Sequence, residues 1–316
     1  MQKIRLGVSS CLLGEQVRYD GGHKHDRYIT ETLGRFFSFV PVCPERDSGM
    51  TVPREAMRLV GDVASPRLVT IKTKRDLTEQ MQHFCDQKVA QLADEDLCGF
   101  IFKKNSPSSG LFRVKVYGDH SGMPAKSGRG LFAAAVTNRF PLLPVEEEGR
   151  LYDPALRENF LERVFCYRRW KDYLAEDGSM AGLVQFHAAH KFLLLSHSPQ
   201  ALRQLGGMVA HGGKQSLQTL QEAYQQRFMQ ALSLHATPAK HVNTLQHIMG
   251  FFKKQLESWE KQELLTVIDQ YRQRLTPLIV PITLLSHYIR KHRHDYLLQQ
   301  VYLSPHPHEL MLRTHI

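Results

Sequence analysis

The sequence lacks any apolar run that is long enough to cross a membrane. The longest candidate, 278–285, is short and contains Pro281 and Thr283, whereas a spanning helix needs about 20 apolar residues. The first ten residues place Lys3 and Arg5 before an apolar stretch that is too short for a signal peptide. These features predict a soluble, cytoplasmic protein without a membrane partner.

The chain also lacks the cysteine pattern of a disulfide framework. Its cysteines are odd in number and have no compact spacing: Cys11, Cys43, Cys85, Cys98 and Cys166. In a chain of this length without a secretory signal, such a set indicates reduced thiols, some of which could be metal ligands.

No internal repeat or low-complexity tract is present, and the composition is that of a folded protein. The chain has 316 residues, of which 42% are apolar, enough for two domains. Its net charge is +10, with 22 basic against 18 acidic residues in 1–150 and 19 against 13 in 151–316. Basic proteins tend to gather RNA and DNA, but many of them bind no nucleic acid, so charge alone is a weak indicator.

The first part of the chain, 1–145, alternates strand and helix patterns. Apolar runs predict strands at 3–8, 37–42, 67–72, 99–102 and 114–117, and helical spacing predicts helices at 77–92 and 130–139. This alternation is typical of a Rossmann-like α/β domain with a parallel sheet, where ligands bind at the carboxyl ends of the strands. The segment 141–152, with its acidic run 146–148, is expected to be a solvated linker.

From residue 153 the pattern becomes helical and few strand signals remain. The periodic segments are 154–174, 182–196, 199–209, 215–234, 240–257, 261–275 and 277–293. We therefore expect a second, all-α domain over 153–316.

Three loops at predicted strand ends carry unusual residues. They are 9–14 with 18–21, then 43–45, then 103–110. If the sheet is parallel, they meet at one edge and bring two thiols, a carboxylate, hydroxyls and basic groups into one cleft. Each has an ordinary alternative, because a cysteine after a strand is often a small buried hydrophobe and a Ser-Pro segment is often a turn. Their joint occurrence favours a functional site, whereas core roles suit Cys85 and Cys98 better.

The strings SSCLLG…VRYDG, VCPE and KKNSPSSG, in this order and spacing, resemble the thiouracil desulfidase family. The resemblance covers roughly the first 140 residues and implies an iron–sulfur enzyme that replaces the sulfur of thiouracil by oxygen without net redox. In that pattern three cysteines hold a 4Fe-4S cluster and leave one iron open. The first two positions correspond to Cys11 and Cys43, and the third corresponds to Ser109.

Ser109 departs from the family pattern, because a hydroxyl is a poor ligand where thiolate is wanted. Three explanations are open. The serine is a substitution made to trap or disable the protein, or it is natural and Cys98 or an outside ligand supplies the third bond, or the cluster has been lost. Every flanking residue still fits the motif, which favours the first explanation.

The resemblance also implies roles for other residues of the three loops. It assigns catalytic roles to Glu45 and Ser106, and a carboxylate can activate the water that replaces sulfur. The residues expected to shape the substrate pocket are Ser10, Arg18, Tyr19, Asp20, Lys103 and Lys104. Arg18 and Asp20 could instead form a structural salt bridge, and Arg54 is similarly ambiguous.

The second part of the chain carries the strings FHAAHK, HVNTLQHIMGFFK, PLIVP and YLSPHP. These resemble the YbgA-like helical domain over nearly all of 155–313. Its fusion to a desulfidase resembles tRNA 4-thiouridine desulfidases, which implies that a thiolated base in tRNA is returned to uridine after it leaves the stack. Alternatives are a desulfidase of free thiouracil and a tRNA-binding module without a cluster.

Basic residues of the second part could contact RNA phosphates, although a solvated surface is the ordinary explanation. They are Lys240, Lys253, Lys254, Arg272, Arg274, Arg290, Lys291, His292, Arg293 and His294. His187 and His190 share a helix face without a matching cysteine or carboxylate set, so we expect them to be buried or to face phosphate rather than to bind zinc.

Overall fold

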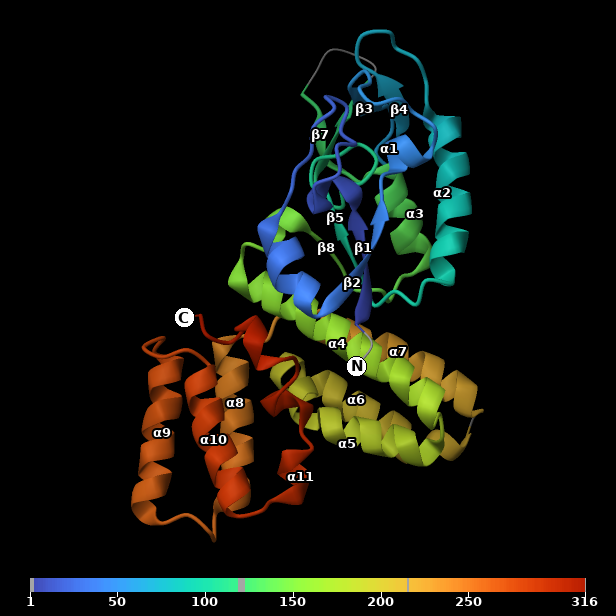
Figure 1. Ribbon diagram of the computed structural model, residues 1–316. Helices are drawn as coiled ribbons and strands as arrows, with labels where there is room; N and C mark the ends of the chain where they lie inside the picture. Colours follow the sequence, from blue (N-terminus) through green and yellow to red (C-terminus); the bar gives the residue numbers. More distant parts are fainter. Residues whose placement is uncertain (1–2, 119–122, 215, 316) are drawn as a thin grey trace. The chain divides into compact units, whose positions relative to one another are not determined.

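The computed structural model describes residues 3–118, 123–214 and 216–315, and it divides the chain into two compact units (Figure 1). Unit 1 comprises Met1–Asp153 and unit 2 comprises Pro154–Ile316. Among the described residues, no helix is both long and apolar enough to span a membrane.

The main sheet of unit 1 is fully parallel. Its strands are β1 (Ile4–Ser9), β2 (Phe37–Val42), β5 (Gly99–Phe102) and β8 (Val145–Glu147), in the order β2-β1-β5-β8. The pairs β1–β2, β1–β5 and β5–β8 all run in the same direction. The predicted Rossmann-like sheet is therefore confirmed, and the carboxyl ends of β1, β2 and β5 lie at one edge.

Helices α2 (Thr78–Ala93) and α3 (Leu131–Arg139) lie side by side against this sheet (Figure 1). The ring of Phe132 on α3 packs 5.8 Å from Phe100 and 6.2 Å from Phe102, measured between ring centroids. Phe132 also packs 6.1 Å from Phe84 of α2. This apolar layer fixes the position of the amino end of α3 relative to β5.

A second sheet, which the sequence analysis did not foresee, contains two of the predicted strands. Its strands are β3 (Met57–Val60), β4 (Arg67–Thr70), β6 (Val114–Tyr117) and β7 (Ala125–Gly128), in the order β4-β3-β6-β7. Only β3 and β6 pair in parallel. The expectation that the predicted strands form one parallel sheet is wrong here, because the strand pattern of β4 and β6 does not specify a partner.

The expected linker at 141–152 is also corrected. Residues 145–147 form β8, and Glu146, Glu147 and Glu148 are buried rather than solvated. Glu147 Oε1 accepts hydrogen bonds from the backbone N–H groups of Leu111 at 2.8 Å and Phe112 at 3.1 Å. These partners, which lie far away in sequence, compensate the burial of the carboxylate.

Unit 2 is entirely helical in its described residues, as the periodicity predicts. Its helices are α4 (Pro154–Glu176), α5 (Met180–His197), α6 (Pro199–Ala210), α7 (Leu217–Leu232), α8 (Pro238–Met249), α9 (Ser258–Arg272), α10 (Ile279–Lys291) and α11 (Asp295–Leu298). Helix α8 is shorter than the predicted 240–257, because it ends at Gly250 and continues only as a 3-10 turn.

The core of unit 2 is rich in aromatic rings. Trp170 of α4 stacks on Tyr224 of α7 at 5.4 Å between centroids, and Phe186 of α5 packs against both. His190 is 2% exposed and stacks on Phe186 at 4.0 Å. His187, one turn away on α5, exchanges a hydrogen bond of 3.0 Å with the Tyr224 hydroxyl. The histidine pair on α5 therefore faces the core of the unit.

Candidate active site in unit 1

A cavity of about 370 Å³ lies where the three predicted loops meet, at the carboxyl ends of β1, β2 and β5. The site residues expected from the sequence that line it are Ser10, Cys11, Arg18, Tyr19, Cys43, Glu45, Lys103, Lys104, Ser106 and Ser109. Convergence from distant parts of the chain follows from the parallel pairing of the strands that precede each loop.

Asp20 is the one expected pocket residue that does not line this cavity. Its Oδ1 lies 3.4 Å from Arg18 Nε and accepts a hydrogen bond of 3.1 Å from the Gly22 backbone. The bond from Gly22 and the charge of Arg18 lower the pKa of Asp20. The structural salt bridge is thus the role that the geometry of Asp20 supports.

Cys11 lies in a 3-10 turn (Ser10–Leu13) directly after β1. Gly14 ends this turn with a φ of 97°, a left-handed conformation that glycine adopts readily. The Cys11 carbonyl accepts a hydrogen bond of 2.9 Å from the backbone of Lys24. Burial raises the pKa of the Cys11 thiol to about 11, although Lys103 acts in the opposite direction.

Cys43 occupies the residue before α1 (Pro44–Asp47), directly after β2. Its backbone N–H donates to Asp47 Oδ2 at 2.9 Å, and its thiol lies 3.5 Å from Glu45 Oε2. Burial and the charge of Glu45 raise the pKa of the Cys43 thiol to about 12. Both cavity cysteines are protonated at neutral pH, so that a metal bound here would displace their protons.

Glu45 is held by hydroxyl groups from the loop that follows β5. Ser108 Oγ donates a hydrogen bond of 2.5 Å to Glu45 Oε1, and Ser106 Oγ donates a longer one of 3.4 Å to the same atom. On the other side of the carboxylate, Arg54 Nη2 lies 3.7 Å from Glu45 Oε2. Because the Glu45 side chain is only 12% exposed, these contacts fix its direction into the cavity.

Arg54 and Ser108 are functional candidates that sequence reasoning did not assign. Arg54 Nη1 donates 3.0 Å to the Val17 carbonyl and its side chain is 9% exposed. Ser108 is fully buried. The sequence signal for Ser108 was its place between Ser106 and Ser109, but nothing in the string indicates which hydroxyl reaches the carboxylate.

The loop that carries these serines is anchored by the amino end of α3. The backbone N–H of Phe132 donates to the Ser108 carbonyl at 2.9 Å, and the N–H of Gly130 donates to the Gly110 carbonyl at 2.7 Å. A Cβ at Gly130 would lie 2.4 Å from the Ser108 carbonyl. Only glycine permits this close approach, which places Ser109, 3% exposed, on the cavity wall.

Glu148 positions the start of the same loop. Its Oε2 accepts a hydrogen bond of 2.7 Å from the Lys104 backbone, and its Oε1 pairs with the ammonium of Lys103. The sequence analysis did not predict this contact, because it interpreted the acidic run 146–148 as solvated surface. The charge of Lys103 is therefore engaged, while the Lys104 side chain is exposed at the rim.

The donor set of this cavity suits an iron–sulfur cluster at two of the three expected ligand positions. Two thiols line one cavity, and the hydroxyl of Ser109 lines it at the third position of the motif. Thiolates fit such a cluster, whereas a serine oxygen is a harder and weaker donor for iron. Among the described residues, no three His, Cys, Asp or Glu side chains are grouped so as to hold a single metal ion.

Cys98 does not supply the missing thiolate. It precedes β5 at the amino end of the strand, is fully buried, and its sulfur lies 3.8 Å from the Asp96 carbonyl. It is absent from the cavity lining. The explanation that Cys98 replaces Ser109 as a ligand is therefore wrong, because the two residues lie at opposite ends of β5.

Comparison with protein families divides the chain in the same way as its fold. Residues 6–148 match a family described as 2-thiouracil desulfurase, and residues 191–307 match a family described as a protein of unknown function, DUF1722.

Two curated proteins, both described as uncharacterized, are similar to parts of the chain. YbgA of Escherichia coli strain K12 is 34% identical over 142 residues, which is 44% of this chain and 84% of that protein. YbbK of Bacillus subtilis strain 168 is 30% identical over 108 residues, which is 33% of this chain and 71% of that protein.

Among solved structures, the 4Fe-4S-dependent thiouracil desulfidase TudS is similar to part of this chain. The two are 26% identical with a TM-score of 0.40, over 49% of this chain and 97% of that one.

Proposed function

The chain belongs to the 2-thiouracil desulfurase family through residues 6–148 and to the YbgA-like DUF1722 family through residues 191–307, and from this premise we propose that it is an iron–sulfur desulfidase that converts 4-thiouridine in tRNA to uridine. Both family resemblances expected from the sequence motifs are thereby confirmed. The cluster and the tRNA substrate are the parts that we propose.

One observation supports the proposed chemistry above all others. Cys11, Cys43 and Ser109 line the same cavity as Glu45 and Ser106. In this proposal the two cysteines hold the cluster and Ser109 occupies the third ligand position. When bound, such a cluster supplies an open iron that attracts the exocyclic sulfur of a thiolated base.

The protein's own groups perform the proton transfers in this account. Glu45, directed by Ser108 and Arg54, accepts a proton from the water that attacks the ring carbon. The carbon–sulfur bond then breaks and the sulfur leaves as hydrosulfide, so that no oxidant or reductant is needed. Ser106, 3.4 Å from Glu45 Oε1, can orient that water or donate a hydrogen bond to the base. The low exposure of these side chains excludes bulk water, which strengthens such contacts.

The tRNA part of the proposal is supported by the charge of the chain and by the second unit. Most of the basic residues singled out in unit 2 are exposed: Lys253, Lys254, Arg272, Arg274, Arg290, Lys291 and Arg293. Exposed lysines and arginines of this kind neutralise phosphates and release counterions, which gives salt-dependent affinity. A base within tRNA must leave its stack to enter a cavity of about 370 Å³.

The desulfuration is tested with the full chain and its Ser109→Cys variant, both reconstituted with iron and sulfide without oxygen. Each is incubated with tRNA that contains 4-thiouridine, with free 4-thiouracil and with free 2-thiouracil, and the bases are quantified by mass spectrometry. We expect the cysteine variant to hold more iron and to convert the tRNA faster than the free bases. A folded, iron-loaded variant without activity on any substrate would contradict the proposal.

A separate titration distinguishes tRNA from the free base as the substrate. We expect tRNA to shift the mobility of the chain with an affinity that falls steeply as salt rises. Activity on free thiouracil without binding of tRNA would favour the alternative of a free-base desulfidase.

A further inference from the structure

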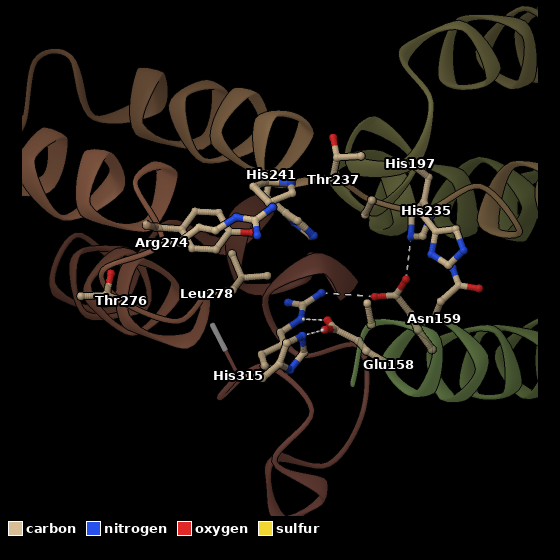
Figure 2. Close-up of a pocket in the computed structure, with 16 residues that line it drawn as sticks. Glu158, Asn159, His197, His235, Thr237, His241, Arg274, Thr276, Leu278 and His315 are labelled. Atoms are coloured by element: carbon tan, nitrogen blue, oxygen red, sulfur yellow. Dashed lines mark hydrogen bonds and ion pairs between the residues drawn. The ribbon is translucent and has the colours of Figure 1, made fainter. Parts of the chain in front are cut away.

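Unit 2 contains a second cavity, of about 360 Å³, that the proposed desulfuration does not use. It lies between α4, the end of α5, the start of α8, the turn after α9 and the last residues of the chain (Figure 2). Most of its lining residues carry a polar or ionisable group, although its accessible surface is mainly apolar. A concave site of this size that combines apolar surface with polar groups suits a small ligand.

The floor of this cavity is a closed network of charges. Arg313 donates to Glu158 Oε1 at 3.0 Å and to Glu162 Oε2 at 3.2 Å. Both ring nitrogens of His197 face oxygen acceptors, Glu162 Oε1 at 2.6 Å and the Leu234 carbonyl at 2.5 Å. The contacts of His197 and Arg313 thus occupy the buried Glu158 and Glu162 side chains at the cavity floor.

Arg274 is a cation of the cavity lining that this network does not engage. Within the described chain its guanidinium has no hydrogen-bond or ion-pair partner, and its backbone holds a φ of 60° at the turn after α9. Two residues further, the Thr276 hydroxyl is buried without a partner. A planar guanidinium that has no partner suits an oxyanion with several acceptor atoms, such as a phosphate group.

Among the described residues that line it, the opposite side of the cavity carries polar side chains but no arginine or lysine. Figure 2 places Asn159 and His235 there, across from Arg274 and Thr276. The Asn159 amide is oriented by its hydrogen bond of 2.9 Å to the Leu232 carbonyl. Between the two sides, the lining is formed by Pro238 and Leu278 together with the Tyr271 ring. These surfaces suit a flat ring that has polar groups along its edge.

We propose that this cavity of unit 2 binds a nucleoside 5′-monophosphate, with the phosphate at Arg274 and the base between Leu278 and Asn159. Such a ligand carries a charged phosphate at one end, then apolar ring faces, then a polar ring edge. The cavity presents complementary groups in the same order. It can be a free nucleotide or the 5′-phosphorylated end of an RNA, since the chemistry is shared. The proposal does not depend on the cluster or on desulfuration.

Isothermal titration of the full chain tests the site with each of the four ribonucleoside 5′-monophosphates, the matching nucleosides and inorganic phosphate. We expect at least one monophosphate to bind at least tenfold more tightly than its nucleoside, which corresponds to about 1.4 kcal/mol. Inorganic phosphate alone should bind more weakly than that nucleotide.

Arg274→Ala should weaken binding at least tenfold. Arg203→Ala is the matched control, because Arg203 is exposed on α6 and lies outside the cavity lining. Thermal unfolding of each variant checks that the helices remain folded.

Three results would overturn the proposal: no nucleotide bound at millimolar concentration, equal losses in the Arg274 and Arg203 variants, or phosphate alone bound as tightly as any nucleotide, which would indicate an adventitious ion only. Competition between the nucleotide and a 5′-phosphorylated RNA oligonucleotide, but not its 5′-hydroxyl form, identifies an RNA end as the source. Nucleotide binding without such competition identifies a free nucleotide, and both outcomes uphold the site.

Discussion

Ser108 Oγ lies 2.5 Å from Glu45 Oε1, although the two residues are separated by 63 positions in the chain. Ser108 is fully buried, and its own hydroxyl is also 2.9 Å from that of Ser106. Two serines of one loop therefore contact one oxygen of the carboxylate, and Arg54 approaches the other. This relationship joins the loop after β5 to the turn after β2 at the centre of the cavity.

Removing the Ser108 hydroxyl should impair catalysis by releasing Glu45. We expect Ser108→Ala to lower kcat roughly tenfold, because a charge-assisted hydrogen bond contributes about 1.5–3 kcal/mol, while the KM for substrate changes little. Ser48→Ala is the matched control, since the Ser48 hydroxyl bonds only to the backbone carbonyl of Glu45 at 3.0 Å. Equal losses in both variants would assign Ser108 a merely structural role.

Glu45 itself should be indispensable for turnover. A general base contributes on the order of 10²- to 10⁴-fold in rate, so we expect Glu45→Gln to lower kcat by at least the smaller factor without loss of bound iron. Glu15→Gln serves as control, because Glu15 is a half-exposed carboxylate that pairs with Arg46 beside the same helix. Single-turnover assays measure both; undiminished activity in Glu45→Gln would remove it from the mechanism.

Arg313 should be a stability determinant of unit 2. Its replacement by methionine leaves two buried carboxylates, Glu158 and Glu162, without their shared cation, and breaking such a pair costs about 3–5 kcal/mol. The exposed pair of Arg272 with Asp269 should contribute less than about 1 kcal/mol. Chemical unfolding of Arg313→Met and Arg272→Met should show this difference, and similar losses would argue against the buried network.

Acid should destabilise unit 2 through its buried histidines. Burial lowers the pKa of His190 and His241 to about 3 and that of His306 to about 4. Below pH 6.5, the ordinary pKa of histidine, the unfolded chain binds protons that the folded unit does not. The folded unit therefore loses stability as pH falls from 6.5 toward 4. Each such histidine contributes about 1.4 kcal/mol per pH unit.

One carboxyl opposes this effect. Burial raises the pKa of Glu158 to about 7, so the folded unit gains stability from this proton as pH falls from 7 to 4.5. The loss of unfolding free energy per pH unit is therefore smaller than three histidines alone would cause. We expect the melting temperature of the full chain to fall between pH 6.5 and 5, and to fall less in His190→Gln. His287→Gln, at an exposed position, should behave as the unchanged protein. A melting temperature that is independent of pH would contradict this account.

The sequence was sufficient to predict three of the four strands of the main sheet and the meeting point of the loops that follow them. Period and composition located β1, β2 and β5, and parallel topology alone then requires that Cys11, Cys43 and Ser109 share an edge. The helices of unit 2 were predictable for a similar reason, since a buried face repeats every turn.

The remaining features depend on partners that are distant in sequence. Glu148 looked solvated because its contacts, Lys103 and the Lys104 backbone, lie about 45 residues earlier. The strands β4 and β6 carried a strand pattern but no signal for their separate sheet. The contact of Ser108 with Glu45 depends on the approach of Gly130 to the loop backbone, which no local pattern encodes.

The account depends most on the two cavity thiols as cluster ligands. The direct measurement is the iron and sulfide content of the anaerobically reconstituted chain with Cys11→Ala, with Cys43→Ala and with Cys85→Ala, whose thiol lies buried in α2 away from the cavity. We predict that both cavity variants lose iron and sulfide together while the Cys85 variant retains them. Full iron content in folded Cys11→Ala and Cys43→Ala proteins would contradict the account.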